Sequence, residues 1–222
     1  MQIAFSKMNG AGNDFVLVDN RDDQVSLSRE QIAQLCHRQR GVGADGLIYL
    51  RNAKNGADWA WEFYNADGSD AEMCGNGARC FARYIQETTG GGETLSFETV
   101  CGVIHAQING ESVTINLTDP QGLALNERIP TSSSEQTVHS LNTGVPHAVL
   151  FVDEVDAAMV SSLGEEIRFH DHFAPAGTNV NFAQILAPGH IRVRTYERGV
   201  GETLACGTGV SASGVIAAHL ND

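Results

Sequence analysis

Residues 72–79 read EMCGNGAR, and residues 204–211 read LACGTGVS. In both stretches a cysteine stands directly before a Gly-x-Gly turn. Apolar residues follow the first turn at helical spacing along residues 78–89, ARCFARYIQETT, and a run of three glycines ends that pattern. We therefore expect a helix to begin at each turn, with Cys74 and Cys206 at the two helix N-termini.

The two cysteine turns belong to a longer repeat. GAGNDFVLVD at residues 10–19 resembles GVPHAVLFVD at 144–153, and GADGLIYL from residue 43 resembles GTNVNFAQIL from residue 177. Chance similarity could explain the two strand-like pieces alone, but the cysteine turns fall in the same register. A duplication is the better interpretation. It predicts two halves, residues 1–118 with Cys74 and residues 119–222 with Cys206.

Local patterns predict the elements between the turns. Ser28 and Gln31 have the spacing of a capping box, so residues 28–40 are expected to form a helix that Gly41 stops. Residues 94–117 alternate in short β-type runs and predict an antiparallel meander. The second half has no counterpart of this meander after Cys206, and we therefore expect that half to be truncated.

Composition and charge exclude several classes of protein. The formal net charge of -13 argues against a surface for nucleic acid or for an anionic membrane. The apolar runs are strand-sized, and the first residues lack the apolar segment of a signal peptide, so we expect a cytoplasmic protein. Five cysteines without an export signal are expected to be free thiols.

A cysteine at a helix N-terminus lies among unpaired amide donors and in the positive end of the helix dipole. These features favour the thiolate and can hold a ligand's carboxylate. Two such turns facing one ligand would place a thiolate on one side of a carbon and a thiol on the other. The pair could invert the carbon next to a carboxylate by removing a proton from one face and returning one to the other.

The sequence offers little for a cofactor or a metal. Pyridoxal phosphate would need a Schiff-base lysine, and the chain has only Lys7 and Lys54, neither in a fitting context. His170 and His172 are the one close histidine pair, and they lie in a polar loop. We predict no cofactor and no metal.

The segments SKMNGAGNDFVLVD, FYNADGS, MCGNGARCFARY, GTNVNF and YERGVGETLACGTG closely resemble the diaminopimelate epimerase family. The resemblance covers residues 3–219. It implies an α+β fold of two pseudo-symmetric α/β halves, each an antiparallel sheet wrapped around a central helix. It also implies cofactor-independent interconversion of LL- and meso-2,6-diaminopimelate, in lysine and peptidoglycan-precursor synthesis, by two cysteines.

The resemblance also assigns residue roles. Cys74 and Cys206 match the catalytic pair, and His147 and Glu197 match groups that tune the protonation of the cysteines. The residues that match substrate-binding positions are, for the reacting carboxylate, Gly75, Asn76, Gly207 and Thr208 and, for the distal amino-acid end, Asn13, Asn65, Asn179, Glu197 and Arg198. Two positions depart from some members: Val145 replaces an asparagine, and Gly46 replaces a glutamine.

Alternatives remain open at several positions and for the function. Cys80 and Cys36 are expected in the core, and the two turn asparagines and His147 would each have a structural interpretation if taken alone. The same fold could epimerise proline, hydroxyproline or another amino acid. A non-catalytic amino-acid-binding module is a further alternative, and a homodimer is a candidate assembly.

Overall fold

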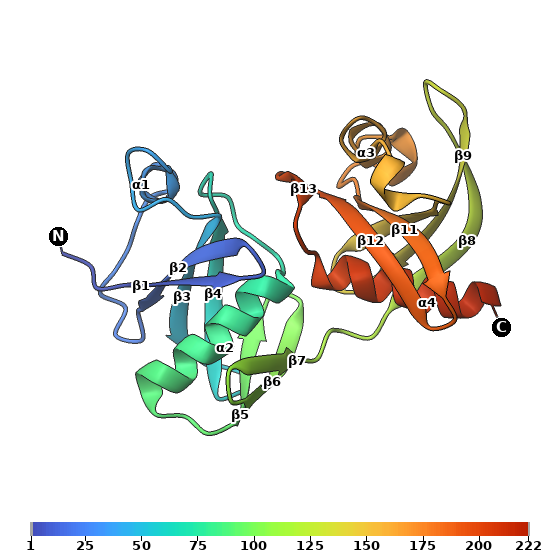
Figure 1. Cartoon of the computed structure of the whole chain (residues 1–222). Helices are drawn as coiled ribbons and strands as arrows, with labels where there is room; N and C mark the ends of the chain where they lie inside the picture. Colours follow the sequence, from blue (N-terminus) through green and yellow to red (C-terminus); the bar gives the residue numbers. More distant parts are fainter. Residues whose placement is uncertain (1, 222) are drawn as a thin grey trace. The chain divides into compact units, whose positions relative to one another are not determined.

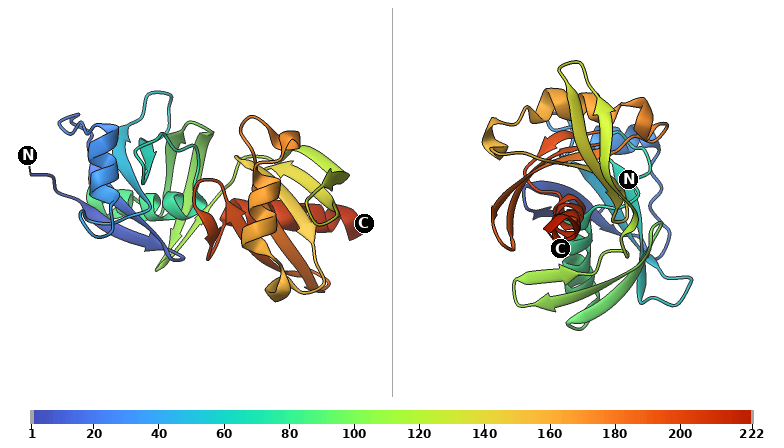
Figure 2. Two further views of the ribbon diagram at one scale, coloured as in Figure 1. Left: turned by 90° about the horizontal axis from the view of Figure 1, so that it is seen from above. Right: turned by 90° about the vertical axis from the view of Figure 1, so that its right-hand side faces the viewer.

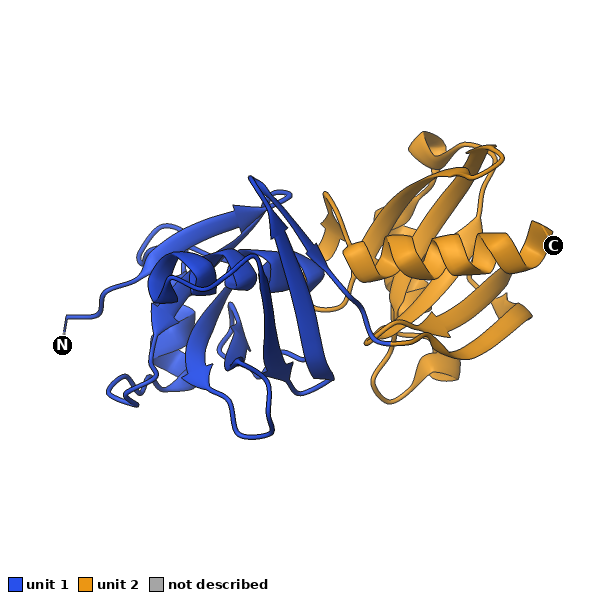
Figure 3. Cartoon of the chain, turned by 90° about the horizontal axis from the view of Figure 1, so that it is seen from below, with its two compact units in different colours: residues 1–118 blue, residues 119–222 orange. Residues whose placement is uncertain are grey.

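The computed structural model describes residues 2–221, and the chain divides into two compact units, residues 1–118 and 119–222 (Figure 3). Each unit has its own sheet and its own core. Within the described residues, none of the helices combines the length and the apolar character that crossing a membrane requires.

The first unit has a seven-stranded sheet whose strands follow each other in chain order (Figure 1). The strands are β1 (Ser6–Gly10), β2 (Asn13–Asp19), β3 (Gly46–Asn52), β4 (Trp59–Asn65), β5 (Thr94–Thr99), β6 (Gly102–Asn109) and β7 (Ser112–Ile115). The helices are α1 (Arg29–Cys36) and α2 (Gly75–Thr89). Strands β5, β6 and β7 form the predicted antiparallel meander.

Both faces of strands β2 and β3 are covered, which explains their almost continuous apolar sequences. Phe15 and Ile48 point to the face on which α2 packs through Phe81. Val16 points to the opposite face, on which α1 packs through Ile32. Helix α2 is therefore the central helix of this unit, and α1 is an outer layer.

Helix α1 is shorter than predicted. The capping box of Ser28 is present, but the helix ends at Cys36, and His37 is already extended. The following loop folds back onto the last turn, where the amides of Gly43 and Ala44 donate to the carbonyls of Leu35 and Cys36 at 3.1 and 3.0 Å. A Cβ at Gly41 would lie 2.1 Å from the Gln34 carbonyl oxygen, so this close return requires glycine.

The second unit has a six-stranded sheet in the order β13-β12-β11-β10-β9-β8. The strands are β8 (Gln121–Pro130), β9 (Glu135–Asn142), β10 (Pro146–Phe151), β11 (Asn179–Ala187), β12 (His190–Glu197) and β13 (Gly201–Thr203). The helices are α3 (Val160–Arg168) and α4 (Gly207–Asn221), with short 3-10 turns at Val155–Ala157 and Asp171–Phe173. Helix α3 and helix α4 pack on opposite faces of the sheet (Figure 2).

The two units share one layout, which confirms the predicted α+β fold with pseudo-symmetric halves. In each unit two parallel strands, β2 with β3 or β10 with β11, are joined through an outer helix, and an antiparallel strand follows. The sheets are thus mixed, whereas the prediction described an antiparallel sheet. The physical reason is the crossover helix between the paired strands, because a helical crossover brings the next strand back in the same direction.

Two of the five cysteines belong to the cores, as predicted. Cys36 and Cys80 are 3% and 6% exposed. Burial raises the pKa of each thiol to about 11, so both remain protonated at neutral pH.

Candidate functional site

The sheet register of the first unit places predicted site residues at one end of three neighbouring strands. Asn13 begins β2, Gly46 begins β3, and Asn65 ends β4. Phe15 pairs with Gly46, and Gly46 pairs with Asn65. Since β2 and β3 are parallel and β4 is antiparallel to them, two strand starts and one strand end meet at the same edge.

Cys74 lies at the start of α2, as predicted. It is the N-cap residue, and its sulfur accepts a hydrogen bond from the amide of Gly77 at 3.4 Å. Gly75, Asn76 and Gly77 form the first turn, where helix amides have no partner within the helix. The turn therefore presents a thiol together with amide donors that suit a carboxylate.

The side chain of Asn13 contacts the cysteine turn. Its Oδ1 accepts from the Cys74 thiol at 3.3 Å and from Nδ2 of Asn76 at 3.4 Å. Its Nδ2 donates to Oδ2 of Asp45 at 2.6 Å. Because the carboxylate can only accept, Asp45 fixes the orientation of the amide and directs the Asn13 carbonyl oxygen at the thiol.

Asp45 is in turn held by Arg38, whose Nη2 lies 2.6 Å from Asp45 Oδ1 and 2.7 Å from Asp14 Oδ1. Hydrogen bonding to Arg38 lowers the pKa of Asp14 to about 2, against the opposing effect of burial. We did not predict a role for Asp45 or Arg38. The available signal was an aspartate immediately before the buried strand β3.

The two departures from the family pattern have different surroundings. A Cβ at Gly46 would lie 2.6 Å from the Tyr64 carbonyl oxygen and 2.8 Å from a ring carbon of Phe63, so no side chain fits there. Val145 is 6% exposed and packs apolar atoms just before β10. In this chain neither Gly46 nor Val145 has a side chain that can form a hydrogen bond.

The sheet of the second unit has predicted site residues at the corresponding ends of its strands. His147 lies at the start of β10, Asn179 begins β11, and Glu197 ends β12. His147 pairs with Asn179 in parallel, and β12 runs antiparallel to β11. By the pairing registers, these three residues correspond in position to Phe15, Gly46 and Asn65 of the first unit.

Cys206 precedes α4 in the same way. The cysteine is 6% exposed, its carbonyl accepts from the amide of Val210 at 2.9 Å, and its sulfur lies 3.4 Å from the hydroxyl of Thr208. The hydroxyl of Thr143 donates to the carbonyl of Thr208 at 3.0 Å and ties the first turn to the end of β9. A second thiol thus lies beside the amide donors of Gly207 and Thr208.

The first turn of α4 packs tightly against the sheet at Gly209. A Cβ there would lie 2.2 Å from Oδ1 of Asn181 and 3.3 Å from Sγ of Cys206. Asn181 is fully buried, and its Nδ2 lies 3.1 Å from Nδ1 of His147. Asn181 was not predicted, although it is one of two asparagines at the start of a mostly apolar strand.

His147 is 1% exposed, and its Nε2 has no hydrogen-bond partner among the described residues. Burial, with a smaller effect from the charge of Arg198, lowers its pKa to about 3. The imidazole is therefore neutral at physiological pH.

Arg198 follows the end of β12, and Asn179 holds it there by accepting from its backbone amide at 2.8 Å. The guanidinium groups of Arg198 and Arg168 both approach the carbonyl of Ala176, at 3.5 and 3.4 Å. Burial and the charge of Arg198 lower the pKa of Arg168. Two converging guanidinium groups favour a bound carboxylate.

Glu197 ends β12, immediately before Arg198, and its carboxylate accepts a hydrogen bond from the hydroxyl of Thr203.

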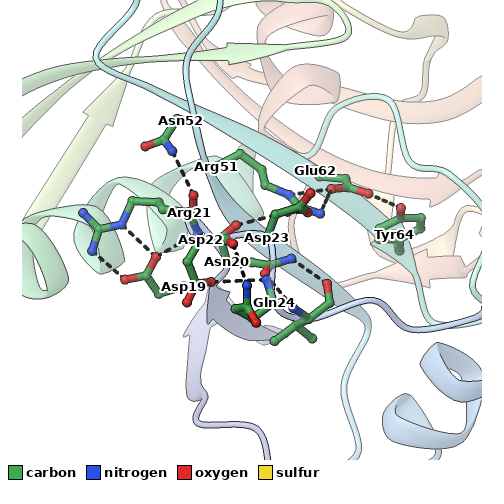
Figure 4. Close-up of polar contacts among 11 residues, drawn as sticks. Asp19, Asn20, Arg21, Asp22, Asp23, Gln24, Arg51, Asn52, Glu62 and Tyr64 are labelled. Carbon is green, nitrogen blue, oxygen red and sulfur yellow. Dashed lines mark hydrogen bonds and ion pairs between the residues drawn. The ribbon is translucent and has the colours of Figure 1, made fainter.

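A separate polar cluster lies at the opposite end of β2, β3 and β4 (Figure 4). Its cations are paired: Arg21 with Asp19 at 2.5 Å, and Arg51 with Asp23 and Glu62, each at 2.6 Å. Asn52 donates to the carbonyl of Arg21 at 2.9 Å. These ion pairs hold the turn after β2, far along the strands from the predicted site residues.

Lys7 and His172, which were weighed above for a cofactor and a metal, contact carboxylates in the structure. Lys7 forms an ion pair with Asp14 at 3.1 Å, and His172 contacts Glu127 at 2.9 Å. Across residues 2–221 no group of three or more His, Cys, Asp and Glu side chains is arranged to hold a metal ion.

The predicted residues thus form two sets, one in each unit. The first set joins Cys74 and Asn76 to Asn13 by hydrogen bonds and places Asn65 at the same sheet edge. The second set has the members Cys206, Gly207, Thr208, His147, Asn179, Glu197 and Arg198.

Comparison with known sequences gives a consistent family. The family model described as diaminopimelate epimerase matches residues 5–122 and 139–222. Curated relatives named diaminopimelate epimerase include those of Aquifex aeolicus, 46% identical over 96% of this chain and 80% of the relative, and of Archaeoglobus fulgidus, 42% identical over 99% and 83%.

Solved structures show the same fold at lower identity. A probable proline racemase from Agrobacterium radiobacter has a TM-score of 0.74 at 16% identity and covers 100% of this chain and 78% of that chain. A hydroxyproline epimerase from Agrobacterium vitis has a TM-score of 0.73 at 20% identity, over 98% and 77%.

Proposed function

The chain belongs to the diaminopimelate epimerase family, and we propose that it interconverts LL- and meso-2,6-diaminopimelate with Cys74 and Cys206 as the proton-transfer groups. It is an isomerase, and its reaction lies in lysine biosynthesis. One observation carries the assignment of residues: each unit presents a cysteine at a helix N-terminus beside the same edge of an equivalent sheet.

The reaction needs two groups on opposite faces of one carbon. A thiolate removes the α-proton and becomes a thiol, while the electron pair left on carbon is delocalised into the adjacent carboxylate. The other thiol gives its proton to the opposite face and becomes a thiolate. Atoms and charge balance, and the reverse reaction exchanges the two roles.

The helix starts supply the stabilisation of charge. The amides of Gly75 and Asn76 in one unit and of Gly207 and Thr208 in the other suit the reacting carboxylate, whose negative charge rises as the proton leaves. Such donors are most effective when they are fixed before the reaction. Thr143 fixes the second turn by its bond to the carbonyl of Thr208.

The surroundings of the two sulfurs differ. The Asn13 carbonyl oxygen can only accept a hydrogen bond, so in this geometry Cys74 is a thiol that donates to it. The hydroxyl of Thr208 can donate to Cys206 and can therefore stabilise a thiolate there. The two cysteines are thus suited to opposite protonation states.

The distal amino-acid end of the substrate requires a cation and an anion. Arg198 can bind its carboxylate, with Arg168 adding positive charge, and Glu197 can bind its ammonium group. Asn13, Asn65 and Asn179 complete the proposed distal contacts with amide groups.

A proline or hydroxyproline substrate is less well supported. The structures with those names are at most 20% identical to this chain, and a likeness at that level concerns the fold. Eight curated relatives at 37–46% identity each have the name diaminopimelate epimerase. A binding module without catalysis would bind the amino acid without exchanging its α-hydrogen.

The test uses LL-diaminopimelate in deuterium oxide. The full chain should replace the α-proton by deuterium and form the meso isomer, both observable by NMR. Cys74→Ala and Cys206→Ala, singly and together, should abolish exchange. Cys101→Ala is the matched control, because this half-buried thiol lies at the β5–β6 turn. Ordinary exchange by the double variant would refute the two-cysteine mechanism.

A cytoplasmic location and a homodimer stay predictions. Cell fractionation would test the first, and sedimentation of the purified chain would test the second.

A further inference from the structure

A buried hydrogen-bond chain in the second unit involves a histidine and an asparagine. From its geometry we infer that Asn181 fixes His147 as a neutral imidazole with its proton on Nε2, so that His147 serves as a hydrogen-bond donor and not as a base. The role as donor rests on the proposed function, because the acceptor would be an anionic group of that reaction.

The orientation of the Asn181 amide follows from its neighbours. Its Nδ2 lies 3.0 Å from the carbonyl oxygen of Ala148, which can only accept. Its Oδ1 accepts from the hydroxyl of Thr195 at 2.9 Å. Exchanging the two amide atoms would place an oxygen against the Ala148 carbonyl, so the nitrogen must stand where it does.

The same nitrogen contacts His147. Nδ2 of Asn181 lies 3.1 Å from Nδ1 of His147 and has one hydrogen left after the bond to Ala148. Nδ1 must accept that hydrogen and therefore carries none. A neutral imidazole has one ring proton, which then resides on Nε2.

Protonation of His147 is disfavoured in this position. An imidazolium would direct a second N–H at the amide hydrogen of Asn181. Burial of His147, which is 1% exposed, and the charge of Arg198 both lower its pKa, to about 3. With Nδ1 occupied and Nε2 already protonated, neither nitrogen can take up a proton at neutral pH.

The Nε2–H group is a buried donor without an acceptor among residues 2–221. Buried polar groups are normally satisfied, and an exception needs an explanation. A donor suits a thiolate, a carboxylate or the enediolate-like charge that develops during proton removal. Asn181 is thus a positioning residue that acts through His147.

The chain of contacts also reaches the catalytic turn. A Cβ added at Gly209, in the first turn of α4, would lie 2.2 Å from Oδ1 of Asn181 and 3.3 Å from Sγ of Cys206, so both side chains border this glycine. The asparagine that orients His147 therefore also supports the turn that presents Cys206.

The first test is NMR of the full chain labelled with 15N-histidine, with the His147 signals identified by their loss in His147→Gln. The expected result between pH 6 and 8 is an unprotonated Nδ1 and a protonated Nε2. A protonated Nδ1 in the wild type would overturn the inference. Asn181→Leu removes the amide donor at similar volume, so the form with the proton on Nδ1 should become detectable. Thr195→Val should leave the proton on Nε2, because the Ala148 carbonyl still orients the amide.

The second test separates a donor from a base. Glutamine can donate a hydrogen bond near the position of Nε2 but cannot act as a base. His147→Gln should therefore keep at least tenfold more deuterium exchange than His147→Ala. Equal loss in both variants would overturn the donor role. A wild-type chain without any exchange would refute the proposed function and, with it, the donor role, while the NMR result would still decide the protonation of His147.

Discussion

Replacing Gly209 by alanine should damage the site by displacing the first turn of α4. The added Cβ would lie 2.2 Å from Oδ1 of Asn181, whereas real Cβ contacts are essentially never under 3.0 Å. The turn or the asparagine must then move by at least 0.8 Å, the difference between these two distances. If Asn181 moved, it would lose hydrogen bonds, because its amide bonds to His147, Ala148 and Thr195.

The expected magnitude follows from these contacts. A displacement of the order of 1 Å at a reacting group can lower the rate about 100-fold, or about 2.7 kcal/mol in the activation free energy. Overpacking should lower the free energy of unfolding by roughly 1–3 kcal/mol. In an unstrained helix position the same substitution would instead stabilise by about 0.5–1 kcal/mol.

Gly214 provides that comparison in the same helix, because a Cβ there meets nothing within 4 Å. Gly214→Ala should keep full activity and gain stability. Gly77→Ala, at the corresponding turn, should have a milder effect than Gly209→Ala, since its nearest neighbour is a side-chain methyl of Ile48 at 3.3 Å. The measurements are deuterium exchange and urea unfolding. Wild-type rate and stability in Gly209→Ala would refute the argument.

Three further substitutions test other parts of the site. Arg198→Ala should raise KM for diaminopimelate by roughly 10- to 100-fold through loss of a charge-assisted bond, and an unchanged KM in steady-state kinetics would count against a distal carboxylate at this residue. Asp45→Ala should free the amide of Asn13 and lower kcat by roughly 10- to 100-fold, with circular dichroism as the control for folding. Asp14→Asn should flatten the pH dependence of unfolding: the folded pKa of about 2 lies below the usual 3.8, so ionised Asp14 stabilises above about pH 4 and this contribution disappears as the pH falls through 2. The contribution of Asp14 to the free energy of unfolding is at most about 2 kcal/mol. Solvent screening reduces it further, because the Arg38 side chain is 52% exposed. If the free energy of unfolding by urea changed equally with acid pH in both proteins, the assignment would be contradicted.

Sequence patterns predicted the features that depend on neighbours along the chain. The Cys74 turn, the capping box of Ser28 and the meander all rest on local hydrogen bonds or alternation. The predicted end of α1 at residue 40 was wrong, because residues 37–40 carry no strong signal that ends a helix. That helix ends where the following loop folds back and donates hydrogen bonds to the carbonyls of Leu35 and Cys36, a return that the pattern of residues 28–40 does not show.

Other features depend on partners distant in sequence. Gly77 and Gly209 look equivalent in the repeat, yet one borders a methyl group and the other borders the buried amide of Asn181. Asp45 and Asn181 orient site residues only because the register of adjacent strands places them there. No periodicity marks such residues. A polar residue within a buried apolar strand is the best available signal.

The placement of all predicted site residues at one edge of each sheet leaves the opposite edge available for labelling. In the first unit this edge carries Lys54, an exposed residue of the turn between β3 and β4, and in the second it carries the exposed turn at Ser133 between β8 and β9. Fluorophores introduced at these two turns through non-natural amino acids would leave Cys74 and Cys206 unmodified. Energy transfer between them would then report, in solution, how the distance between the two units responds to substrate.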